Sequence, residues 1–545
     1  MHSIDVVLAM LLAVAASGYL IRIIPFSLPL PLVQIALGAV IAGVLDRGHE
    51  LEPELFFLLF LPPLLFLDGW RIPKQGLFRD KGAILELAFG LVIFTVVGAG
   101  LLIHWMIPPM PLAVAFALAA IISPTDPVAV SSVTSRVPVP KRLMHILEGE
   151  SLLNDASGLV CFQFAVVAVL TGTFSLATAS MTFIWVALAG LGAGVAVTFG
   201  LSKVQGWIWR HFGEEPGSAI LVNLITPFSA YLLAEWLHAS GILAAVAAGI
   251  TMSYVELAGN APGAMRVQRS AVWDTVQFTF NGIMFVLLGE QLPGILVGAV
   301  HSVREAGHLN PWWLVVYVLA ISVALAVLRF SWVWLSLRWN LLKAQRRGEN
   351  STSPPWRVVV ATSLAGVRGA ITLAGVLTLP LLMPDGSPFP ARQLTIFLAT
   401  AVILVSLLVA SVALPRLLKG LELPEEPNHE REEDLARTAS ARAALEAVER
   451  LRQKYATDEL QAERYNAAAT EVAALYQRKL GQVDAADSNP VEARAYEQAL
   501  RELRGAGLKA ERNELFKLAR QRKISDELSR RLVHNLDLIE SRQRS

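Results

Sequence analysis

The chain contains little charge and a single cysteine for its length of 545 residues. Charged residues make up 17% of the sequence, compared with about 25% in soluble globular proteins, so a wholly soluble protein is excluded. The lone cysteine, Cys161, rules out a disulfide within the chain. The net charge is +1, and no basic block is long enough to indicate nucleic acid as a partner.

The charge that is present lies mostly at the C-terminal end. Residues 419–545 hold 47 of the 91 Asp, Glu, Lys and Arg residues, although they are less than a quarter of the chain. This division predicts a polytopic membrane domain over residues 1–418 and a polar tail over 419–545. The N-terminus lacks the basic segment of a signal peptide, so the apolar run after residue 5 is expected to be the first span.

Apolar runs bounded by charge, proline or glycine predict an all-α membrane domain of thirteen spans. Their approximate ranges are 6–24, 30–46, 52–70, 83–106, 111–134, 145–170, 178–202, 218–237, 241–255, 270–298, 312–337, 358–382 and 394–418. With the N-terminus outside, 17 Lys and Arg residues fall on the inner side and three on the outer side. The positive-inside rule therefore predicts an outer N-terminus and a cytosolic C-terminus.

The tail follows a hinge that contains Pro424 and Pro427. Alanine, glutamate, arginine and leucine at helical spacing predict two helical stretches, 430–482 and 490–543. We expect a cytosolic helical hairpin or coiled coil. It either regulates the membrane domain or is a solvated appendage, and the sequence names no ligand for it.

The fifth predicted span contains Asp126 between Pro124 and Pro127. Two prolines three residues apart should unwind a helix locally. At membrane depth such a break survives only when it is buried in protein or lines a cavity, where its free carbonyls and helix ends can serve an ion. The alternative is a simple kink that Asp126 caps.

The sixth predicted span carries four polar residues, Glu150, Ser151, Asn154 and Asp155. On a helix they form one stripe, because residues four apart face the same way. They offer the hard oxygen donors that alkali cations prefer, and no Cys or His is placed beside them for a soft metal. A carboxylate that is removed from water and set beside like charge also holds a proton more tightly. Competition between a cation and a proton for one carboxylate is sufficient for exchange.

Two further charged residues lie within spans. Arg368, flanked by glycines in the twelfth span, needs a carboxylate partner, for which Glu150 and Asp126 are the candidates. Asp68 lies near the inner end of the third span, either paired with a nearby base (Arg71 or Lys74) or taking part in transport. The breaks in spans five and twelve are seven spans apart and so run in opposite directions, as in an inverted repeat of spans 1–6 and 8–13.

Four motifs now stand in order along the chain: LPPLLFLDG from Leu61, SPTDP from Ser123, EGESLLND from Glu148 and GVRG from Gly366. In this order and spacing the sequence resembles bacterial sodium/proton antiporters of the cation:proton antiporter-1 family, relatives of the animal sodium/hydrogen exchangers. The resemblance covers roughly residues 50–415.

The resemblance implies a secondary transporter and not an enzyme, with no cofactor. It further implies a homodimer in the lipid of the bacterial cytoplasmic membrane, with a core domain that moves against a dimerisation domain. Sodium export and pH homeostasis would be its role. Na⁺ and H⁺ would share Asp155, and Ser151, Thr125 and Glu150 would add oxygens. Asp126 and Asn154 would shape the crossing helices, Arg368 would pair with Glu150, and Asp68 would assist transport. Asparagine before Asp155 is the pattern associated with electroneutral exchange.

Other functions are compatible with the same residues. Oxygen donors do not by themselves choose among Na⁺, Li⁺ and K⁺, so K⁺/H⁺ exchange is the nearest alternative. A passive cation channel would need a continuous file of weak sites, whereas the sequence offers one cluster near the middle of the membrane. A sensor with a signalling tail is a third alternative.

Overall fold

The structure is a computed structural model in which two compact units follow one another, Met1–Leu421 and Glu422–Ser545. Its described residues are 2–23, 28–45, 53–72, 81–126, 130, 141–172, 176–213, 215–257, 263–305, 312–346, 355–419, 427–454, 465–466 and 468–477, with eight positions from 507 onward.

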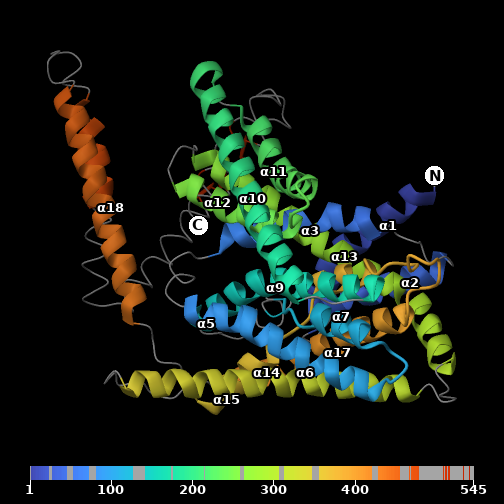
Figure 1. Ribbon diagram of the computed structural model, residues 1–545. Coiled ribbons are helices and arrows are strands. Elements are labelled where there is room, and N and C mark those ends of the chain that lie inside the picture. Colours follow the sequence, from blue (N-terminus) through green and yellow to red (C-terminus); the bar gives the residue numbers. More distant parts are fainter. Residues whose placement is uncertain are drawn as a thin grey trace. The chain divides into compact units, whose positions relative to one another are not determined.

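The first unit is built from helices (Figure 1). In chain order they are α1 (His2–Ile23), α2 (Leu30–Leu45), α3 (Pro53–Arg71), α5 (Lys81–Leu85), the π-helical turn η1 (Glu86–Leu91), α6 (Val92–Met106), α7 (Leu112–Ile122), α9 (Lys141–Thr171), α10 (Leu176–Phe212), α11 (Pro216–Trp236), α12 (Gly241–Leu257), α13 (Gly263–Glu305), α14 (Trp312–Arg346), α15 (Trp356–Leu364), α16 (Ala370–Leu377) and α17 (Arg392–Leu418). Among the described residues, pairing of β type is limited to one bridge between Leu382 and Pro388.

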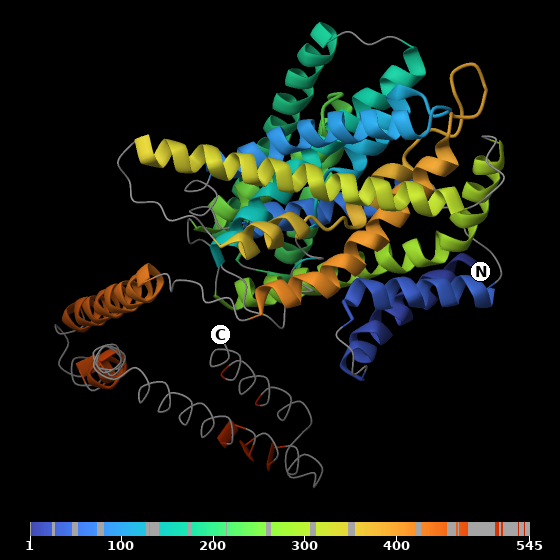
Figure 2. The same ribbon diagram turned by 90° about the horizontal axis from the view of Figure 1, so that it is seen from below.

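The helices are long and apolar, as the predicted spans require. Within the described part of the chain, eight are long and apolar enough to cross a membrane, and three shorter apolar helices accompany them. The all-helical membrane fold is therefore confirmed, while thirteen crossings remain a prediction. Figures 1 and 2 show α14 alongside α6, against which it packs.

Two helical runs are interrupted where the sequence predicts a break. α7 ends at Ile122, and residues 123–126 are not helical; residues 127–129 lie outside the described part. α15 and α16 are separated by residues 365–369. Proline precedes both α7 and α15, where its missing N–H removes no helical bond. The backbone N–H of Asp126 donates to the carbonyl of Val367 over 2.7 Å, so the two breaks cross each other.

Reciprocal glycine contacts join two pairs of helices. α2 and α13 meet at Gly38 and Gly289: a Cβ at either position would lie 1.9 Å from a backbone oxygen of the other helix. α3 and α12 meet at Gly69 and Gly249 in the same way, with Cβ-to-oxygen distances of 2.6 Å and 2.0 Å. Small residues allow membrane helices to approach at backbone distance, and they fix α3 and α13 beside the site described below.

The second unit contains α18 (Pro427–Lys454) and helical pieces between residues 465 and 477. The described parts of the first predicted tail stretch, 430–482, are therefore helical. The second predicted stretch, 490–543, lies almost wholly outside the described residues.

Alanine substitutions on α13 test the close helix contact. Gly289→Ala should lower the Tm, because its methyl group meets the backbone of α2 at 1.9 Å and overpacking costs about 1–3 kcal/mol. Gly294→Ala is the matched control, since no atom lies within 4 Å of its added Cβ and alanine favours a helix by about 1 kcal/mol over glycine. Thermal unfolding in detergent should shift in opposite directions for the two variants. Equal shifts would contradict the packing.

Candidate functional site

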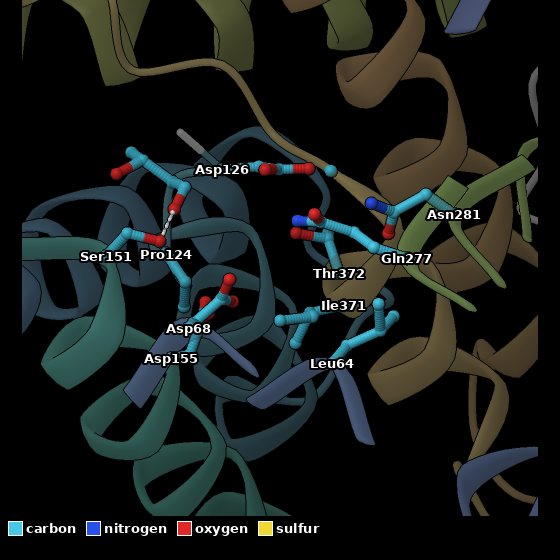
Figure 3. Close-up of a pocket in the computed structure, with 12 residues that line it drawn as sticks. Leu64, Asp68, Pro124, Asp126, Ser151, Asp155, Gln277, Asn281, Ile371 and Thr372 are labelled. Carbon is cyan, nitrogen blue, oxygen red and sulfur yellow. Dashed lines mark hydrogen bonds between the residues drawn. The ribbon is translucent and has the colours of Figure 1, made fainter. Parts of the chain in front are cut away.

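A small cavity lies where the broken helices meet α3, α9 and α13 (Figure 3). Its volume is about 20 Å³, roughly the room that one water molecule needs. The lining residues are Leu64, Asp68, Pro124, Thr125, Asp126, Ser151, Asp155, Gln277, Asn281, Gly369, Ile371 and Thr372. Five residues of the predicted site (Asp68, Thr125, Asp126, Ser151 and Asp155) thus share one cavity.

Hydrogen bonds hold the first break against α9. The Ser151 hydroxyl donates to the backbone carbonyl of Thr125 over 2.7 Å. The dashed line at Ser151 in Figure 3 marks this bond. The Asn154 amide donates to the Thr125 hydroxyl over 3.0 Å. Both bonds satisfy polar groups that the unwound segment would otherwise leave unpaired, and they fix the oxygens of Thr125 and Ser151 at the cavity wall.

Glu150 is held in a buried ion pair with Arg329 of α14. One guanidinium nitrogen lies 2.5 Å from Oε1, and the other lies 2.8 Å from Oε2. The Arg329 side chain is 3% exposed and the Glu150 side chain is 1% exposed. The predicted pairing of Glu150 with Arg368 is therefore wrong. A carboxylate held at both oxygens is the strongest arrangement for a buried acid, and Arg329 occupies both of them.

Arg368 instead serves the ends of the broken helices. Its Nε donates to the carbonyl of Ile122, the last residue of α7, over 2.9 Å. Its Nη1 donates to the carbonyl of Gly366, just beyond α15. Helix C-termini carry unpaired carbonyls and partial negative charge, so a buried guanidinium inside the crossing is satisfied without a carboxylate.

Asp126 lies against the N-terminal end of α16, where the second interrupted helix resumes. A Cβ at Gly369 would come within 1.8 Å of Asp126 Oδ2, so the carboxylate packs directly against this glycine. Gly369 is the N-cap of α16, where the helix dipole favours negative charge. Only glycine leaves room for the carboxylate at this point.

Asp155 differs from Glu150, the acid five residues before it on α9. It is 4% exposed and lines the cavity, yet it makes no hydrogen bond or ion pair with any residue that the structure describes. Glu150, five residues earlier on α9, is neutralised by Arg329. Burying a charged carboxylate is costly unless a proton or a cation compensates it, and Asp155 faces the cavity, where either could bind.

Asp68 enters the cavity from α3 and is half-buried. Arg71, one of its two suggested partners, pairs with Asp274 of α13 over 2.5 Å. The other suggested partner, Lys74, lies outside the described residues. Asp68 and Asp155 both line this small cavity, and so does Asp126, so three acids from different segments of the chain meet there (Figure 3).

Sequence reasoning missed four contributors: Arg329, which binds Glu150, and Gln277, Asn281 and Thr372, which line the cavity. Arg329 gave a signal, because a base within an apolar span is expected to have a buried partner. Gln277 and Asn281 stand four residues apart in an apolar stretch of α13, a spacing that places two amides on one face.

Comparison with known proteins agrees with this geometry. Residues 9–420 match the family described as "Sodium/hydrogen exchanger, transmembrane". The chain is 42% identical over 540 residues to the Escherichia coli protein named uncharacterized Na⁺/H⁺ exchanger YjcE, covering 98% of each. It is 45% identical over 415 residues to a sodium, potassium, lithium and rubidium/H⁺ antiporter of Bacillus pumilus, covering 75% of this chain and 60% of that protein.

The fold also has a solved counterpart. The sodium proton antiporter MjNhaP1 of Methanocaldococcus jannaschii superposes with a TM-score of 0.55 at 18% identity, over 77% of this chain and 99% of that one. At this identity the likeness shows the fold alone. The matched family and the relatives named above are secondary transporters and not enzymes, and such exchangers carry Na⁺ and H⁺ without a cofactor. The extent of the family match and the identity to YjcE together show that this chain belongs to the sodium/hydrogen exchanger family.

Proposed function

We propose that this protein exchanges Na⁺ or Li⁺ for H⁺ across the membrane, with Asp155 as the shared carboxylate. One observation carries the proposal: Asp155 lines the cavity without a partner among the described residues, whereas Glu150 is bonded at both oxygens. Ser151 and Thr125 supply neutral oxygens beside it. Asn154 and Asp126 hold the surrounding backbone, and Asp68 assists from α3.

The exchange follows from occupancy of this one group. The Asp155 carboxylate releases its proton when a cation binds to it and to the neighbouring oxygens. When the cation leaves, the carboxylate binds a proton again. The site then carries the same charge with a bound proton as with a bound alkali cation, because either ion adds one positive charge to Asp155. Glu150 remains neutralised by Arg329 throughout. The proposed exchange is therefore electroneutral, one cation for one proton, and serves sodium export and pH homeostasis.

The second candidate function is K⁺/H⁺ exchange. Two Bacillus relatives, 45% and 43% identical, are named for transport of sodium, potassium, lithium and rubidium. This chain spans 60% of the length of each. Their names support a site that accepts several alkali cations, and the hard oxygen donors of the cavity are compatible with all of them.

The wider architecture belongs to the same proposal. It comprises thirteen spans in the bacterial cytoplasmic membrane, an outer N-terminus, a cytosolic helical tail over 419–545 and a homodimer whose core domain moves. The glycine contacts support an inverted repeat of spans 1–6 and 8–13. In each of the two helix pairs, each glycine faces the carbonyl three residues before its partner glycine. That relation is the one expected if the pair α2–α13 corresponds to the pair α12–α3.

Replacing the shared carboxylate should abolish exchange. Asp155→Asn removes the charge that both ions need, so a Na⁺ pulse should no longer release protons in reconstituted vesicles. Asp385→Asn is the matched control, because Asp385 is exposed and, among the described residues, its side chain bonds its near neighbour Ser387 alone. Full activity of Asp155→Asn would overturn the site, and single-channel currents from the wild type would favour a channel.

Proton competition should appear in the affinity for Na⁺. Where Asp155 is mostly protonated, the apparent KM for Na⁺ should fall by about tenfold for each pH unit gained. The rate at a fixed, low Na⁺ concentration should therefore rise between about pH 6 and about pH 9, as protons leave the shared carboxylate. Initial rates in vesicles of equal internal and external pH measure this. A KM that is independent of pH would exclude a shared group.

The partner of Glu150 can be identified by a double-mutant cycle. Arg329→Gln leaves a buried carboxylate unpaired and should cost about 3–5 kcal/mol of stability. Adding Glu150→Gln should restore much of the lost Tm, because no unpaired charge remains. Arg368→Gln should not be rescued by the same second change. Rescue of Arg368→Gln with no rescue of Arg329→Gln would restore the pairing predicted from the sequence.

A further inference from the structure

The wall of the cavity opposite α9 carries two amide side chains. Gln277 and Asn281 stand one helical turn apart on α13 and both line the cavity. Figure 3 shows them across the cavity from Ser151, with their amide groups directed toward Asp126 and Thr372. Both are half-buried. Most of the other lining residues come from α3, α9 and the two helix breaks, which carry the four sequence motifs. The amides of α13 lie outside those motifs.

The side-chain oxygen of Gln277 is already used in a hydrogen bond. Nη1 of Arg71 donates to Gln277 Oε1 over 2.8 Å. Arginine has no acceptor atom, so the oxygen must face Arg71 and the NH₂ group is the half left over. Arg71 is itself fixed by its ion pair with Asp274. An NH₂ group favours a bare carboxylate in the cavity and contributes nothing to a cation.

Asn281 is not held in this way. It makes no hydrogen bond with any residue that the structure describes. Its amide can therefore rotate and present Oδ1 to a cation or its NH₂ group to an empty carboxylate. Amide oxygen is a hard, neutral donor that suits alkali cations.

The polar side chains of α9 cannot rotate in this way. Ser151 and Asn154 both bond Thr125, which fixes their positions relative to the break. A cation smaller or larger than the gap between these oxygens and Asp155 needs an adjustable ligand to complete its shell. Asn281 is placed to provide one.

We propose that Asn281 is a cation ligand and a selectivity-determining residue, whose Oδ1 completes the coordination of the ion from α13. The proposal rests on the exchange proposed above. The number and strength of the oxygen ligands decide which alkali cation is held best. Losing one oxygen should harm Na⁺ and Li⁺ more than K⁺ and Rb⁺, because the smaller ions lose more hydration free energy on entering the site.

The test measures the apparent KM for Na⁺, Li⁺, K⁺ and Rb⁺ with the full-length protein in vesicles. Asn281→Leu keeps the approximate size and removes the oxygen, so the KM for Na⁺ should rise about tenfold and the KM for K⁺ distinctly less. Asn281→Asp keeps an oxygen of the same reach, and its KM for Na⁺ should not exceed that of the wild type. Thr275→Ala is the control on α13, since its hydroxyl donates to the carbonyl of Ala271 one turn earlier in the same helix.

Each outcome of this test either supports or overturns the role of Asn281. An unchanged ratio of the KM values for Na⁺ and K⁺ in Asn281→Leu, in a wild-type background that exchanges cations for protons, overturns the role of Asn281 and leaves the exchange intact. Equal losses in the leucine and aspartate variants also overturn it, because then the oxygen is not the cause. No cation-driven proton movement in the wild type would instead refute the proposed function. If Asn281→Leu fails to fold, the aspartate variant decides: a raised KM for Na⁺ overturns the role, and a KM at or below the wild-type value supports it.

Discussion

The ion pair between Glu150 and Arg329 is the interaction on which the rest of the site depends. Four acids gather near the crossing of the broken helices, and four unpaired charges could not remain together at membrane depth. Arg329 binds both oxygens of Glu150 in a fully buried pair. Glu150 is thereby neutralised, and Asp155, five residues further along α9, is left as a buried carboxylate with no bonding partner among the residues that the structure describes.

The crossing of the breaks places the polar groups where they are needed. Its backbone bond, from Asp126 to Val367, brings together the C-terminal ends of α7 and α15 and the N-terminal end of α16. Arg368 satisfies carbonyls at the C-terminal ends of α7 and α15, and Asp126 packs at the N-cap of α16. Charged residues thus compensate the interrupted helices, so the unwound segments can present Thr125 and its neighbours to the cavity at small cost.

The sequence predicted the parts of the site that are local in the chain. Proline spacing indicated the break at Asp126, and helical spacing placed Ser151 and Asp155 on one stripe. It could not choose the partner of Glu150, because Arg329 and Arg368 are both buried bases and which of them reaches a carboxylate is decided by tertiary packing. The amides of α13 were missed for the same reason: Asn281 gains a role only when α13 is set against α3 and α16.

The central claim is that a single exchangeable carboxylate trades one cation for one proton. The most direct measurement holds vesicles at a fixed Na⁺ gradient and finds the pH gradient at which proton movement stops, over a series of imposed membrane potentials. The account predicts that this balance point lies where the Na⁺ and H⁺ gradients are equal and does not move with voltage. A balance point that shifts with membrane potential would show that charge moves in each cycle and would contradict it.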